Sequence, residues 1–168
     1  MSLTKKTVFF LLWTSLATAV LYFLHITGSQ TIARAILPVS FISILVALLH
    51  GTTTSVLVGF FAPTASFLAT GLPQVDLLLP MVLESVTVGL LAPVFQGKFR
   101  NLYLTCVFDF VSAKIVWILA VYLGKSDVKV RVDILSGLVG LGFQLIFIPM
   151  VYKILVKSFK IEKQKGGI

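Results

Sequence analysis

Residues 102–123 read LYLTCVFDFVSAKIVWILAVYL, an apolar stretch that nevertheless contains two ionisable side chains, Asp109 and Lys114. As a helix it is long enough to cross the apolar core of a bilayer, which needs about 20 residues. A charge in such a segment is costly unless it is paired or solvated, so it generally serves a function. Residues 77–95, LLLPMVLESVTVGLLAPVF, repeat the pattern with Glu84. Glu84 and Lys114 therefore predict a site inside a membrane that binds a polar group.

The composition of the whole chain also favours a membrane protein. It has 168 residues, of which 58% are hydrophobic and 12% are charged, and its mean hydropathy is +1.04. Soluble domains carry about twice that share of charge, and one of this length could not bury so much apolar surface. The length fits a single domain over residues 1–168, with room for about six helices of about 20 residues.

Six apolar segments predict an all-α integral membrane protein with six transmembrane helices. The second segment is short for a crossing, so it either begins earlier, near Ile32, or is partly re-entrant. The first segment continues past the length of a signal sequence and lacks a convincing cleavage site, so we interpret it as a retained span. The expected segments are about 7–25, 37–50, 54–70, 77–95, 102–123 and 134–155.

The distribution of basic residues predicts the orientation. With the amino terminus in the cytoplasm, nine Lys and Arg residues fall on cytoplasmic segments and four on external ones. This excess predicts that both termini are cytoplasmic in a multi-pass protein of the cell membrane. The nine are Lys5, Lys6, Lys98, Arg100, Lys153, Lys157, Lys160, Lys163 and Lys165, and the four are Arg34, Lys125, Lys129 and Arg131.

The loops and the tail suggest partners of different kinds. The loops expected outside are longer and more polar than those expected inside, as in proteins whose loops cover a binding site for an external solute. The basic tail at about 156–168 is expected to be a solvated helix end near anionic lipid head groups. The net charge of +8 is therefore attributed to the lipid bilayer, and no nucleic-acid partner is expected.

Three polar side chains on consecutive predicted helices fall at similar depths. Glu84, Lys114 and Gln144 lie about seven, nine and ten residues from the expected external ends of their spans, or roughly 10–15 Å at the helical rise. Ser85 adjoins Glu84, and Trp117 follows Lys114 by three residues, which places Trp117 on roughly the same face. An aromatic wall with a few convergent polar groups is typical of a small-molecule pocket.

A structural role is the alternative for the Glu84–Lys114 pair, which would then only fix the register of the helices. The two roles are compatible, because a ligand can insert between the partners. Asp109 lies five residues before Lys114, about 140° away on a helical wheel. It is therefore expected to face something else, either a partner subunit or a water-filled crevice.

The sequence offers no catalytic signature. It contains no HExxH motif, no Gly-rich phosphate loop and no nucleophile elbow, and its single cysteine, Cys106, excludes a multi-cysteine metal site. We therefore expect a protein that is not an enzyme and that has no catalytic residues, metal or cofactor.

Several motifs follow one another over about residues 15–155. ARAILPVSFISILVALLHG, SVLVGFFAPTASFLATGLP and LLPMVLESVTVGLLAPVF contain a Leu-Pro pair, a Gly-Phe-x-Ala-Pro stretch, a Gly-x-Pro loop and Glu84. Ser112-Ala113-Lys114 and the run from Gln144 to Pro149 follow. In this order they resemble the substrate-binding subunit of energy-coupling factor (ECF) vitamin transporters, and most closely the branch with pantothenate-type and hydroxymethylpyrimidine-type subunits. Lys114 replaces the Arg that is usual in that family, so a planar clamp becomes a point charge.

The resemblance implies an uptake function. Such a subunit binds a water-soluble vitamin or precursor outside the cell, hydrolyses no ATP itself, and works with a transmembrane coupling subunit and two cytoplasmic ATPases. Its first three spans face the coupling subunit, which makes Ser15 and Ala19 small packing positions at the partner interface. The implied substrate-binding residues are Glu84, Lys114 and Gln144, followed by Ser85, Trp117, Gln74 and Arg34.

The substrate itself stays open at this point. Either Lys114 pairs with a substrate carboxylate, or Glu84 accepts from an amine or hydroxyl. Pantothenate, a pyrimidine, a thiamin precursor and a flavin are all compatible with the motifs. The alternative function is a small structural membrane protein of the cell-shape scaffold type, which would bind no ligand tightly.

Overall fold

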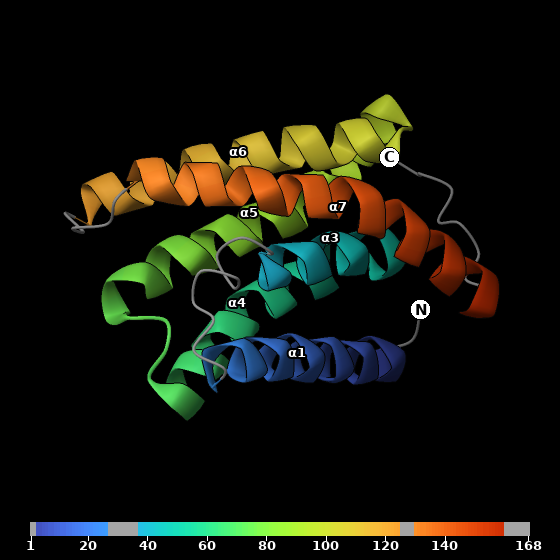
Figure 1. Ribbon diagram of the computed structural model, residues 1–168. Coiled ribbons are helices and arrows are strands. Elements are labelled where there is room, and N and C mark those ends of the chain that lie inside the picture. Colours follow the sequence, from blue (N-terminus) through green and yellow to red (C-terminus); the bar gives the residue numbers. More distant parts are fainter. Residues whose placement is uncertain (1–2, 27–36, 125–129, 160–168) are drawn as a thin grey trace.

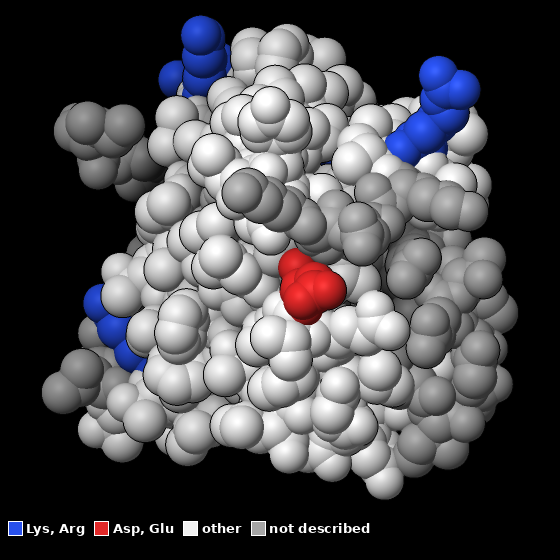
Figure 2. Space-filling model, turned by 90° about the vertical axis from the view of Figure 1, so that its left-hand side faces the viewer, with Lys and Arg blue, Asp and Glu red and all other residues white. Residues whose placement is uncertain are grey.

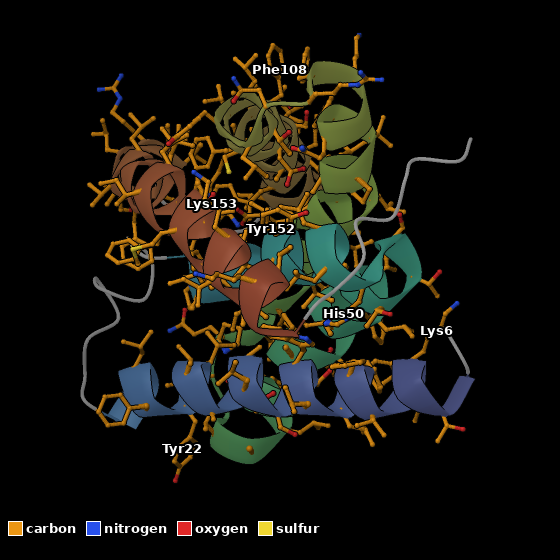
Figure 3. The ribbon with its side chains drawn as sticks, turned by 90° about the vertical axis from the view of Figure 1, so that its right-hand side faces the viewer. Lys6, Tyr22, His50, Phe108, Tyr152 and Lys153 are labelled. Carbon is orange, nitrogen blue, oxygen red and sulfur yellow. The ribbon has the colours of Figure 1, made fainter. Side chains whose placement is uncertain are left out.

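The structure, a computed structural model, describes residues 3–26, 37–124 and 130–159. The regular structure of these residues is α-helical: consecutive helices from α3 to α7 run in alternating directions in Figure 1, and α1 crosses the bundle obliquely in Figure 3. The six expected helical segments are confirmed, and their bounds differ by at most four residues from those expected. The helices are α1 (Leu3–Ile26), α3 (Pro38–His50), α4 (Thr52–Thr70), α5 (Val75–Phe99), α6 (Leu102–Leu123) and α7 (Val130–Phe159).

The lengths and the surfaces of these helices indicate a multi-pass membrane protein. Five of the described helices are long and apolar enough to cross a membrane. Large apolar side chains such as Leu68, Leu123 and Ile146 lie exposed on the outside of the bundle, where lipid would cover them. The exception is α3, whose 13 residues extend only about 20 Å at the helical rise. Ile32, where a longer second span was expected to begin, lies outside the described residues.

The short helix α3 occupies the centre of the bundle. It contacts α1, α4, α5 and α7, and most of its side chains are buried. A helix that is apolar on every face is stable only when it is surrounded, which explains its central position. Gly51 joins it to α4 with a φ of 88°, a backbone conformation that glycine adopts without a steric penalty. Ser55 Oγ then donates to the Ser43 carbonyl oxygen at 2.7 Å.

Glycines allow α4 and α5 to pack closely. A Cβ atom on Gly59 would lie 2.7 Å from the carbonyl oxygen of Ser85, and one on Gly89 would lie 2.8 Å from Ser55 Oγ. The two contacts are reciprocal, one from each helix. Close approach through small residues is a common way to pack helices in membranes. Here it also fixes the backbone of Ser85, next to Glu84.

Helix α1 lies at the edge of the bundle. Only 11% of its span Lys6–Leu24 is buried, and it is attached through Ala17 and Leu21, which are buried, and through the ring of Phe9 stacked on His50 at 4.2 Å. Figure 3 shows His50 between α3 and α1, and Tyr22 pointing away from the bundle. Ser15 and Ala19, the small residues expected at a partner interface, lie on the exposed face of α1.

Replacing Gly59 with alanine should destabilise the bundle. The added methyl group would collide with backbone atoms of α5, so the two helices must separate, at a cost of about 1–3 kcal/mol. Thermal unfolding in detergent measures this as a lower melting temperature. Gly97→Ala is the matched control, because nothing lies within 4 Å of a Cβ at this position. Equal melting temperatures for the two variants would contradict the close packing.

Candidate functional site

Helices α5 and α7 begin, and α4 and α6 end, toward the left of Figure 1. The short α3 begins nearer the centre of the bundle, with its first turn facing this end. The turn between α4 and α5 is held by two hydroxyl groups of α4. Ser66 Oγ and Thr70 Oγ1 both donate to the Leu72 carbonyl oxygen at 3.2 Å, and Thr70 Oγ1 accepts from the Leu72 N–H at 3.1 Å. This turn forms part of the wall of a cavity.

The cavity has a volume of about 100 Å³. Its wall is mostly apolar and is contributed by α1, the first turn of α3, the turn at residues 72–74, α5, α6 and the first turn of α7. Pro38, Leu77, Met81 and the indole of Trp117 are among the apolar residues that line it. Its polar lining residues are Ser40, Gln74, Glu84, Ser85, Lys114 and Asp133.

A three-membered charge cluster borders this cavity. The ammonium of Lys114, on α6, lies 2.9 Å from Glu84 Oε1 on α5 and 3.1 Å from Asp133 Oδ2 on α7. It also lies 5.1 Å from the centre of the Trp117 ring, within the range of a cation–π interaction. The Lys114 and Glu84 side chains are 6% and 7% exposed, and Asp133 is 14% exposed. The cluster is thus nearly dry, with Asp133 as its most accessible member.

Helix α7 makes room for the lysine stem at Gly137. A Cβ atom there would lie 3.1 Å from Lys114 Cε and 3.4 Å from the Phe110 ring. The absence of a side chain at residue 137 therefore lets the Lys114 stem pass between α6 and α7 toward Asp133.

Sequence reasoning missed Asp133. The sixth span was expected to begin at about residue 134, which left Asp133 in the preceding loop. The helix begins instead at Val130, and Asp133 lies in its first turn, where an acidic side chain also interacts favourably with the helix dipole. An acidic residue directly before an apolar span, in a chain with an intramembrane lysine, was the signal that could have found it.

The structure brings together most of the other expected binding residues. Glu84, Ser85, Lys114, Trp117 and Gln74 all line the cavity. Gln144 does not: it follows the first residue of α7 by fourteen positions, about 21 Å along the helix. Its side chain is buried, and neither amide atom has a hydrogen-bond partner among the described residues. Arg34 lies outside the described residues.

Asp109 is separate from the cluster. Its side chain is fully buried on α6, and neither carboxylate oxygen has a hydrogen-bond partner within the described part of the chain. Of the two surroundings considered for it, a partner subunit is not compatible with full burial in the bundle. A buried polar group without a partner costs about 1–3 kcal/mol.

Replacing Asp109 with valine should therefore raise the free energy of unfolding by about 1–3 kcal/mol, because it removes an unpaired carboxyl from an apolar interior. The melting temperature in detergent measures the effect. Asp76→Asn, at an exposed position of α5, should leave the melting temperature unchanged. A less stable Asp109→Val protein would show that the carboxyl makes a stabilising contact.

The chemistry available at the site is charge recognition. No group of three His, Cys, Asp or Glu side chains that could hold a metal ion occurs in residues 3–26, 37–124 and 130–159. Figure 2 shows this end of the molecule, with acidic side chains near its middle and Lys and Arg toward its periphery.

Comparisons of this chain with protein-family models, curated proteins and solved structures find no match. The choice of a function therefore rests on the geometry of the site and on the order of the sequence motifs.

Proposed function

We propose that this chain is a membrane-embedded binding subunit that captures a small polar solute from outside the cell, as the substrate-binding subunits of ECF-type importers do. One observation carries the proposal. A buried cluster of two carboxylates and an ammonium borders a cavity of about 100 Å³. The solute is a water-soluble vitamin or precursor, and the chain acts without catalysis of its own.

The cavity favours binding over a purely structural role. A salt bridge that only fixes helix register needs two partners in a close-packed interior. Here Lys114, Glu84 and Asp133 all line an open volume, together with the hydroxyl-bearing Ser85 and the ring of Trp117. Convergent polar groups in an apolar concavity are the general form of a small-molecule site. A cell-shape scaffold, the alternative function, has no use for such a volume.

The basic residues support an external position for the cavity. Most of the described Lys and Arg residues outside the cluster lie at the opposite end of the bundle. Lys6 on α1 and Lys153 on α7 are visible there in Figure 3, and Lys98 and Lys157 lie in the last turns of α5 and α7. By the positive-inside rule that end is cytoplasmic, so the cavity opens toward the outside.

The exposed face of α1 suits the proposed coupling subunit. Ser15 and Ala19 lie four residues apart on a helix that is largely uncovered. A second helix can approach closely over such small side chains. The opposite face of α1, with Ala17 and Leu21, is already buried in the bundle.

Ligand binding can be tested by thermal stability. Purified protein is screened against water-soluble vitamins and their precursors, and a ligand at 100 times its dissociation constant should add about 2.7 kcal/mol of stability. Glu84→Gln, which keeps the side-chain shape but removes the charge, should weaken binding of that ligand at least tenfold.

The control for the Glu84 variant is Asp76→Asn, which makes the same change of charge on the same helix, at an exposed residue that does not line the cavity. Its affinity should equal that of the wild type. If no compound stabilises folded protein, the scaffold function is favoured and the binding function is wrong.

The interface can be tested separately. Ser15→Phe and Ala19→Phe should abolish uptake of the ligand by intact cells, because each places a large ring where a partner helix must approach, while ligand affinity of the purified subunit stays unchanged. Val111→Phe, at an exposed position of α6, is the control and should leave uptake intact. Normal uptake in both α1 variants would exclude this face as the coupling surface.

A further inference from the structure

The described residues that line the cavity carry a net negative charge. Of the described residues that line it, only Glu84, Asp133 and Lys114 carry a formal charge, so the sum is one negative charge. The helix ends add little to this sum. Helices α5 and α7 begin and α4 and α6 end toward this end of the bundle, so their dipoles, positive at the start of each helix and negative at its end, largely cancel.

The ammonium of Lys114, the one cation among the described lining residues, is already neutralised. Lys114 Nζ donates to one oxygen of each acid, Glu84 Oε1 and Asp133 Oδ2, and faces the ring of Trp117. No described residue donates a hydrogen bond to the second oxygen of either acid. An anionic ligand would therefore meet a compensated lysine and two like charges, whereas a cation would find one oxygen of each acid to which no described residue donates.

The volume and the lining limit the rest of the ligand. One water-sized group needs about 10–15 Å³ of cavity volume. A cavity of about 100 Å³ therefore holds on the order of ten non-hydrogen atoms. The apolar lining, with Met81 and the Trp117 ring, suits a flat or aliphatic body rather than a polyhydroxylated one.

We infer that the site selects a small monocation, either a primary amine or a protonated nitrogen heterocycle, whose positive nitrogen is bound by Glu84 and Asp133 and whose apolar body lies against Trp117. The inference rests on the proposed binding function and specifies its substrate class. The sequence left two modes of binding open, a substrate carboxylate paired with Lys114 or a substrate amine or hydroxyl that donates to Glu84. The inference selects the amine bound by Glu84. Lys114 then acts as the internal counter-ion that holds both acids until the ligand arrives.

The test uses three probes of nearly one shape: benzylamine, benzyl alcohol and benzoate. Their affinities for the purified full-length chain are measured by thermal shift, beside any compound found in the vitamin screen. Benzylamine should bind at least tenfold more tightly than benzyl alcohol, because only the cation gains the two carboxylates. Benzoate should bind more weakly than either.

Two variants change the formal charge of the site in opposite directions. Asp133→Asn brings it to zero and should weaken benzylamine binding at least tenfold, which removes the preference over benzyl alcohol. Lys114→Met brings it to two negative charges and should bind benzylamine at least as tightly as the wild type. A site for anions would instead lose its ligand in Lys114→Met. If Lys114→Met does not fold, the effect of Asp133→Asn on benzylamine affinity tests the inference. Asp76→Asn is again the control.

The possible outcomes separate this inference from the proposed function. A screened compound or probe that binds as an anion or a neutral molecule, with benzylamine weaker, overturns the inference and leaves the binding function intact. If none of the three probes binds, the test uses the vitamin or precursor that stabilises the protein most. A cationic compound then supports the inference, and an anionic or neutral one overturns it. If no compound of any charge stabilises folded protein, both the inference and the binding function are wrong.

Discussion

The two salt bridges from the Lys114 ammonium to the carboxylates of Glu84 and Asp133, in an apolar interior, are the constraint on which this site depends. Lys114 lies on α6, which packs between α5 and α7, and each neighbour supplies one acid. Charges removed from water are stable only with partners at close range, and loss of one partner of such a pair costs about 3–5 kcal/mol. The cluster therefore ties three helices together at one level, close to the end where α5 and α7 begin.

The short central helix creates the space beside this cluster. Because α3 has only 13 residues, it cannot fill the bundle from end to end as its longer neighbours do. Its first turn, at Pro38–Ser40, lines the cavity, so the cavity lies where a longer helix would continue. The preceding residue, Leu37, has a φ of 52° and a ψ of 56°, a left-handed conformation that is rare for a bulky side chain. Strained backbone of this kind is found most often beside binding sites.

Much of this arrangement could be predicted from the sequence, for physical reasons. A bilayer requires long apolar helices, so the helices were identifiable from length and hydropathy alone. A charge inside a span needs a partner or solvent, so Glu84 and Lys114 could be assigned to one site, while their pairing with each other stayed one of two alternatives. Trp117 and Ser85 followed from helical spacing relative to these two residues.

The remainder could not be predicted, because a membrane helix is apolar on both its lipid-facing and its inward-facing sides. The periodicity that orients a helix in a soluble protein is therefore weak in α7, and nothing in the sequence showed that Gln144 lies far below the cavity. The ends of membrane helices are equally hard to place, since helical structure continues into polar residues once lipid no longer selects against them. Asp133 was missed for this reason, by a single residue.

The structural and the binding interpretations of the charge cluster describe one arrangement in two states. Without a ligand, Lys114 satisfies both acids and fixes α5, α6 and α7 relative to one another. In the proposed binding function, a ligand cation would bind the oxygens of Glu84 and Asp133 that Lys114 leaves without a donor, so Lys114 need not be displaced. Asp133 is the most exposed of the three side chains and stands in the first turn of α7. It is therefore the acid that a proposed cationic ligand would reach first.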